Sequence, residues 1–129
     1  MRILVTNDDG YRADGIRTLV EAARPLGQVS VVAPDREQSA TSHSLTLNNP
    51  LRVSRRGAGV LAVDGTPTDC VILGLGMLLE ERPNVVLSGI NHGPNLAANG
   101  GTSAPYTPNL RQDLESTLTS ILADIKAGI

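Results

Sequence analysis

Short apolar runs alternate with polar breaks over the first ninety residues of the chain. Three of these runs are brief and end in turn-forming residues, at 3–5, 29–33 and 85–88. This pattern predicts buried strands. Between the first two strands in chain order, apolar residues recur at helical spacing at Ile16, Leu19, Val20 and Ala23. This order of strand, helix and strand predicts a βαβ unit with a parallel pair and a right-handed crossover.

The boundaries of two helices can be predicted from capping residues. The first helix is expected to start at Asp14 as N-cap and to end before Pro25 and Gly27. A second is expected to start at Thr66 as N-cap with Pro67 at the first helical position. It runs apolar to Leu79, and its glycines, Gly74 and Gly76, are expected to allow close packing on the sheet.

Two further features complete the predicted fold. Residues 51–53 and 60–63 are expected to be short strands joined by a turn at residues 55–59, where Arg55 and Arg56 form a solvated tip. A last helix is expected from Asn109, with an apolar stripe at Leu110, Leu114, Leu118, Ile121, Leu122 and Ile125. We expect that stripe to pack on the sheet or on a second subunit, so homo-oligomer formation stays open. The pattern predicts one α/β domain over residues 1–129, with a Rossmann-like, three-layer fold, a mostly parallel sheet and helices on both faces.

The composition of the chain argues against several classes of function. Net charge is −2 and Lys126 is the only lysine, which argues against a nucleic-acid polymer as partner, because phosphate-backbone binding needs clustered cations. No apolar run approaches the ~20 residues of a membrane helix. The start at Met1 runs directly into a strand with no signal peptide, so a cytoplasmic protein with no membrane partner is expected. The single cysteine, Cys70, lies in an apolar stretch and is interpreted as a core residue.

The candidate chemistry lies where the first strand ends, in Asn7, Asp8, Asp9 and Gly10. Ligands of open α/β sheets bind beyond the carboxyl ends of the strands. Two adjacent carboxylates repel, and a divalent ion offsets that repulsion. A metal site and a plain solvated turn both remain open on this stretch alone, since these residue types also favour turns.

Polar residues also follow the other predicted strands. The loop at residues 34–44 is rich in hydroxyls, including Ser39, and the strand at 85–88 is followed by Asn91 and His92. Residues 100–103, Gly-Gly-Thr-Ser, offer backbone amides and hydroxyls that suit a phosphate. The same composition also describes a plain linker.

Taken together in chain order, these motifs resemble the SurE (survival protein E) family. The matching segments are residues 1–10, 32–36, Ser39, 44–47, 65–70, 88–91 and 93–96. The resemblance implies a cytoplasmic, metal-dependent phosphatase, a 5'-nucleotidase that hydrolyses nucleoside 5'-monophosphates. It divides the chain into a family-like core at 1–96 and a divergent loop and helix at 97–129, and family members continue beyond the length of this chain.

The resemblance also implies roles for individual residues. Divalent metal, Mg²⁺ or Mn²⁺, would be held by Asp8, Asp9, Ser39 and Asn91, which are hard ligands suited to these ions. The phosphate would lie near Asn95, Thr102 and Ser103. Asp8 or Asp9 would help the attacking water, and covalent attack by Asp8 stays open.

Three alternatives compete with this interpretation. The segment 97–105 departs from the family pattern, so the chain could be a shortened core that binds metal or phosphate with little or no turnover. A phospho-acceptor receiver domain needs a third aspartate at the end of a later strand and a nearby lysine. In this chain the third strand ends in Ser88 and is followed by Asn91, which disfavours a receiver domain. A haloacid-type phosphatase needs Asp-x-Asp, which Asp8 and Asp9 do not provide.

Overall fold

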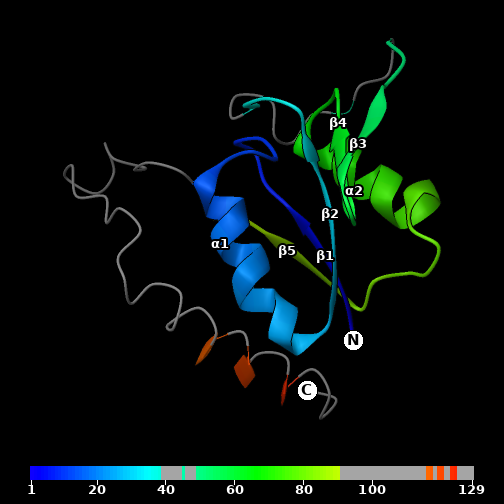
Figure 1. The fold of residues 1–129 in the computed structure, drawn as a ribbon. Helices are drawn as coiled ribbons and strands as arrows, with labels where there is room; N and C mark the ends of the chain where they lie inside the picture. The colour runs from blue at the N-terminus through cyan, green and yellow to red at the C-terminus, as the bar shows by residue number, and fades with distance from the viewer. Residues whose placement is uncertain (39–44, 46–48, 91–115, 118, 121–122, 125–129) are drawn as a thin grey trace.

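A five-stranded sheet with the strand order β3-β4-β2-β1-β5 organises the protein (Figure 1). The computed structural model describes residues 1–38, 45, 49–90, 116–117, 119–120 and 123–124. The strands are β1 (Arg2–Thr6), β2 (Gln28–Pro34), β3 (Val53–Gly57), β4 (Val60–Val63) and β5 (Val85–Ser88). The helical elements are α1 (Asp14–Ala23), η1 (Arg24–Leu26), α2 (Pro67–Leu73) and η3 (Gly74–Leu78).

The sheet is mostly parallel, as predicted. β1 pairs in parallel with β2 on one side and with β5 on the other, and β2 pairs in parallel with β4. Only β3 runs antiparallel, in a hairpin with β4. The carboxyl ends of β1, β2, β4 and β5 therefore meet at one edge of the sheet, which we call the carboxyl edge.

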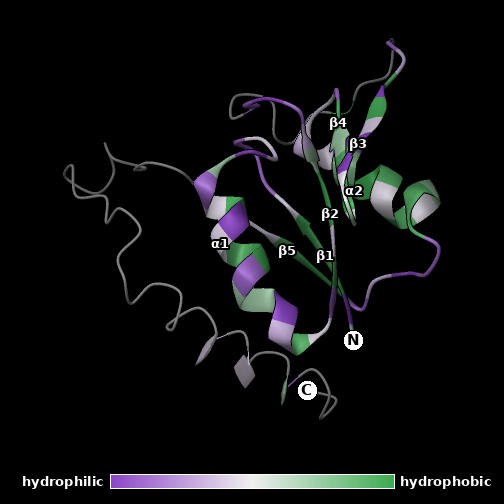
Figure 2. Ribbon diagram, viewed as in Figure 1, coloured by the Kyte–Doolittle hydropathy of each residue, from purple (hydrophilic) through white to green (hydrophobic). Residues whose placement is uncertain are grey.

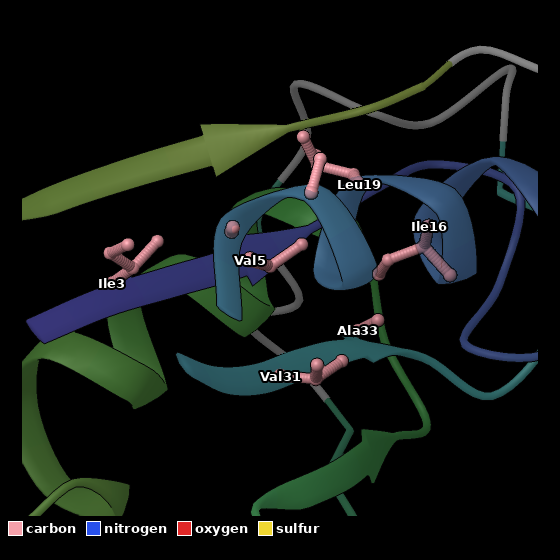
Figure 3. Packing of buried hydrophobic residues seen from close by; sticks show 8 residues of the cluster. Ile3, Val5, Ile16, Leu19, Val31 and Ala33 are labelled. Atoms are coloured by element: carbon pink, nitrogen blue, oxygen red, sulfur yellow. The ribbon is translucent and has the colours of Figure 1, made fainter. Parts of the chain in front are cut away.

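Helices cover both faces of the sheet, which confirms the predicted three-layer α/β fold. On one face, Ile16 and Leu19 of α1 pack on side chains of β1 and β2 (Figure 3). On the other face, Cys70 of α2 packs with Leu4 and Val32. Successive strand residues point to opposite faces of the sheet. β1 therefore supplies Ile3 and Val5 to the core that α1 covers and Leu4 to the core that α2 covers.

The first helix is amphipathic but is capped differently from the prediction. Figure 2 shows apolar and polar residues alternating along α1. The N-cap is Ala13, which makes no side-chain capping bond, so the prediction that Asp14 is the N-cap was wrong. Asp14 is instead the first helical residue, where its negative charge interacts favourably with the positive end of the helix dipole. The chain leaves the helix through η1 and Gly27, so the predicted end is confirmed.

The second helix begins as predicted. The Thr66 hydroxyl accepts a hydrogen bond of 3.1 Å from the backbone N–H of Asp69, and the Asp69 carboxylate accepts one of 2.8 Å from the Thr66 N–H. This reciprocal capping box uses both residues to satisfy free amides of the first turn. Asp69 is buried by this arrangement, so its carboxylate is part of the helix start.

The hairpin differs from the prediction. Arg55 and Arg56 lie within β3 and are exposed, and the turn is formed by Ala58 and Gly59. Gly59 has a φ of +70°, a conformation that favours glycine. The prediction was wrong because β3 is a solvent-exposed edge strand, whose polar residues resemble a turn in sequence.

The two glycines near the end of α2 have different surroundings. A Cβ added at Gly74 would lie 3.1 Å from Leu4 Cδ2 in the buried core, whereas one added at Gly76 meets nothing within 4 Å. The predicted close packing on the sheet is therefore confirmed for Gly74 and wrong for Gly76.

This contrast gives a test of the packing. Gly76→Ala should raise the free energy of unfolding by about 0.5–1 kcal/mol, because alanine is the better helix former. Gly74→Ala should lower it by about 1 kcal/mol, because the added methyl group crowds Leu4. Urea denaturation of both variants measures the difference, and equal shifts would contradict the described contact.

The predicted last helix lies mostly outside the described residues. Asn109 and the apolar stripe are not among them, whereas the six described positions between 116 and 124 are helical and exposed. None of the helices in the described part of the chain has the length and apolar character needed to cross a membrane.

Candidate active site

The loop that follows β1 is held in shape by Asn7. This side chain is 1% exposed. Its Nδ2 donates to the Gly10 carbonyl at 2.7 Å, and its Oδ1 accepts from the Gly10 N–H at 3.2 Å. The amide group therefore closes a tight turn that displays Asp8 and Asp9, the two residues it encloses.

Gly10 is needed in this turn for two reasons. Its φ is +104°, a backbone angle that residues other than glycine rarely adopt. A Cβ at this position would lie 3.3 Å from the backbone carbonyl carbon of Arg36. The turn after β1 therefore packs directly on the backbone of the loop that follows β2.

Two backbone hydrogen bonds join these loops. The Gln38 N–H donates to the Asp8 carbonyl at 2.7 Å, and the Tyr11 N–H donates to the Pro34 carbonyl at 2.9 Å. The loop after β2 therefore lies beside the acidic pair as far as Gln38. Ser39 is the next residue in the chain and lies outside the described residues.

The electrostatics of the acidic pair suit a cation. Asp8 and Asp9 are both partly buried. Burial raises the pKa of Asp8, and the neighbouring charges of Asp9 and Glu37 raise it further. A carboxylate whose ionised form is disfavoured by nearby negative charge is stabilised when a cation binds. The carboxylate oxygens of the pair are hard donors, which fit a hard divalent ion.

Strand β5 ends beside β1 at the carboxyl edge. The Gly89 N–H, directly after β5, donates to the Thr6 carbonyl at 2.9 Å. Gly89 has a φ of +146°, and Ile90 is the last described residue before Asn91. The Thr6 hydroxyl is buried and has no hydrogen-bond partner among the described residues. Three chain segments therefore converge at the carboxyl edge.

The acidic pair is the described part of the predicted site. Within the described ranges, no group of three or more His, Cys, Asp and Glu side chains could hold a metal ion. The remaining predicted ligands and phosphate contacts lie outside those ranges: Ser39, Asn91, Asn95, Thr102 and Ser103.

Two features of the site were missed in the sequence. The role of Asn7 has a partial signal in the sequence, since asparagine side chains often bond to the nearby backbone in turns and glycine is a common turn residue. A second feature is a contact between Tyr11 and the guanidinium groups of Arg12 and Arg56. Arg56 comes from the distant hairpin, so no local pattern predicts this contact.

The cysteine is a core residue, as predicted. Cys70 is fully buried in the α2 cluster. Burial, followed by the charge of Asp69, raises the pKa of its thiol to about 12. The thiolate is therefore scarce at neutral pH, which argues against a nucleophilic role.

Comparison with known proteins agrees with this geometry. The family model described as survival protein SurE matches residues 3–106. The 5'-nucleotidase SurE of Geobacter sulfurreducens is 55% identical over 123 residues, which are 95% of this chain and 45% of that protein. The 5'-nucleotidase SurE of Gemmatimonas aurantiaca is 65% identical over 96 residues, 74% of this chain and 38% of that protein.

A solved structure shares the fold. The crystal structure of the SurE protein from Aquifex aeolicus superposes with a TM-score of 0.67 and 50% identity, covering 74% of this chain and 40% of that one. This chain spans about half the length of the curated relatives it matches, for example 48% of the 5'-nucleotidase SurE of Geotalea daltonii.

Proposed function

Because this chain belongs to the survival protein SurE family, we propose that it carries the catalytic core of a metal-dependent phosphatase. The proposed reaction hydrolyses nucleoside 5'-monophosphates to nucleosides and phosphate, in the cytoplasm. The names of the relatives, 5'-nucleotidase SurE, support the substrate class. The proposal also leaves room for association with further copies of the chain.

The observation that carries the proposal is the acidic pair at the carboxyl edge. Asp8 and Asp9 are displayed by a turn that Asn7 fixes through two hydrogen bonds. Burial, followed by the negative charges of Asp9 and Glu37, raises the pKa of Asp8. A divalent cation offsets the repulsion between two adjacent carboxylates, which supports a cation site at this turn.

We assign the metal to four ligands: Asp8, Asp9, Ser39 and Asn91. The backbone hydrogen bond from Gln38 to Asp8 supports the inclusion of Ser39, the next residue. The hydrogen bond from Gly89 to Thr6 brings the end of β5 beside β1 and supports the inclusion of Asn91, two residues beyond the cis-linked Gly89. These oxygen donors favour Mg²⁺ or Mn²⁺ over zinc.

The chain's own groups then have distinct roles in hydrolysis. When bound, the ion supplies Lewis-acid polarisation of a phosphoryl oxygen and lowers the pKa of water. Asp8 or Asp9 orients the attacking water and accepts its proton. Asn95, Thr102 and Ser103 bind the phosphoryl oxygens through an amide and hydroxyls. Because phosphoryl transfer depends on positioning and charge stabilisation, the fixed turn around Asn7 contributes directly to the rate.

Phosphate release tests the proposal. The chain should release inorganic phosphate from nucleoside 5'-monophosphates in Mn²⁺, lose this activity in EDTA and regain it when Mn²⁺ is added in excess. The reason is that the proposed ligands hold the ion reversibly through oxygen atoms. Release that continues unchanged in EDTA would contradict a metal-dependent reaction.

A second candidate is a core that binds metal or phosphate without appreciable turnover. It is favoured by the departure of residues 97–105 from the family pattern. Calorimetry separates the two candidates: Mn²⁺ binding without phosphate release favours the binding module, whereas binding with release favours the phosphatase.

A further inference from the structure

Tyr11 gathers two arginines beside the acidic pair. The Tyr11 hydroxyl accepts a hydrogen bond from Arg12 Nε at 2.9 Å. The guanidinium carbon of Arg12 lies 5.2 Å from the centroid of the Tyr11 ring, and that of Arg56 lies 5.6 Å from it. Both distances are typical of cation–π contacts. A residue of the β1 loop therefore holds together two cations that are far apart in sequence.

Neither of these cations forms an ion pair with a carboxylate among the described residues, although the charge of Asp35 acts on Arg12 from a greater distance. The ion pairs there join Arg2 to Glu81 and Arg36 to Asp35, and none includes Arg12 or Arg56. Both of these arginines are exposed. Two like charges held near one ring both attract an anion that binds beside them.

The cluster is close to the proposed reaction site. Tyr11 is separated from Asp9 by Gly10 alone, and its backbone N–H is fixed to the Pro34 carbonyl at 2.9 Å. The site therefore combines two anionic side chains suited to a metal ion with two neighbouring cationic side chains. The cations are available to a part of the substrate other than the phosphate at the metal.

We propose that Arg12 and Arg56, positioned by Tyr11, bind a second phosphoryl group of the substrate, distinct from the one that is hydrolysed. The substrate class is a nucleotide that carries two separate phosphates. This inference rests on the proposed function for the location of the scissile phosphate.

Phosphate fits this cluster better than a nucleobase does. A planar guanidinium donates two parallel hydrogen bonds to phosphate oxygens, and such charge-assisted bonds are strong. A base would have to stack on the ring of Tyr11, but that ring is already engaged by both guanidinium groups. Base recognition is therefore treated as a contrary outcome of the test.

Calorimetric binding in Mn²⁺ tests the inference with two probes, adenosine 3',5'-bisphosphate and adenosine 5'-monophosphate. The bisphosphate should bind about tenfold more tightly than the monophosphate, since an additional charge-assisted contact is made. Arg12→Gln and Arg56→Gln should each remove most of this preference while leaving monophosphate affinity within about twofold.

Arg55→Gln is the matched control. Arg55 is the exposed neighbour of Arg56 in β3, but it lines a cavity of about 420 Å³ together with Arg2 and Glu80, near the starts of β1 and β2. This substitution removes the same charge and should preserve the preference. Thermal unfolding of all three variants checks that the fold is retained.

Three results would overturn the inference: equal affinity of the unmodified chain for both probes, a preference unchanged in Arg12→Gln and Arg56→Gln, or an equal loss in Arg55→Gln. Tight binding of adenosine alone that depends on Tyr11 would instead assign the cluster to the base. Repeating the titration in EDTA separates this inference from the proposed function. Arginine-dependent binding of the bisphosphate should persist there, even if Asp8 and Asp9 prove not to hold a metal.

Discussion

Replacing Asp8 and Asp9 together with asparagine is expected to abolish the stabilisation of the fold by Mn²⁺ and to lower phosphate release by about 1,000-fold or more. The rate loss corresponds to about 4 kcal/mol of transition-state stabilisation, which is within the range that a catalytic metal supplies. For the unmodified chain, Mn²⁺ at 100 times its dissociation constant should add about 2.7 kcal/mol to the free energy of unfolding.

The same variant should behave in the opposite way when the metal is removed. The pKa of Asp8 is raised above its ordinary value of 3.8 in the folded protein. The folded state therefore binds this proton more tightly than the unfolded state does, and stability falls as pH rises from 3.8 through the raised pKa. At pH 7 in EDTA, the asparagine variant should unfold at a higher temperature than the unmodified chain, and the order should reverse in Mn²⁺.

Glu80 and Glu81 provide a matched control for this experiment. They are also adjacent acidic residues but are exposed, and they line the cavity near the starts of β1 and β2. Glu81 forms a surface ion pair with Arg2 at 3.0 Å, and such exposed pairs contribute little to stability. Replacing both with glutamine removes the same charge and should leave the Mn²⁺ response intact. An equal loss of the response in this control would show that net charge, and not the acidic pair, governs metal binding.

The second large effect is expected at Asn7. Asn7→Ala removes both hydrogen bonds to Gly10 and leaves the buried Gly10 N–H without its side-chain partner, which should cost about 1–3 kcal/mol of folding free energy. It should also weaken the response to Mn²⁺, because the two carboxylates are no longer held in one conformation. Chemical denaturation measures the first effect and calorimetry the second.

Asn49 is a suitable reference because it is exposed. Asn49→Ala should change stability by less than about 0.5 kcal/mol, as is usual for surface substitutions. If the two variants lose equal stability, the turn does not depend on the Asn7 side chain.

The central strands β1 and β2 could be predicted from the sequence because their apolar runs are largely buried. β5 was recognised by its apolar residues, but the prediction that it is buried was wrong, because it is an edge strand whose side chains are half-buried or exposed. Residues 3–5, 29–33 and 85–88 were recognised, and the structure extends the first two by a residue or more. Their parallel pairing then places Asp8 at the carboxyl edge without further information. The exposed strand β3 lacks this pattern, so Arg55 and Arg56 were assigned to a turn.

The finer structure of the site depends on contacts that sequence patterns do not encode. The approach of Arg56 to Tyr11 is set by the path of the hairpin across the sheet. The raised pKa of Asp8 depends on the burial of the loop and on Glu37, which arrives from the segment after β2. Ser39 and Asn91 remain predictions, since they lie outside the described residues.

The two hydrogen bonds between the β1 and β2 loops have a consequence for local opening. The amide protons of Tyr11 and Gln38 are donated in opposite directions across the same pair of loops. Neither loop can therefore swing away alone without exposing both amides to solvent. In deuterated water these two protons should exchange together, as one cooperative unit that is slower to open than a surface turn.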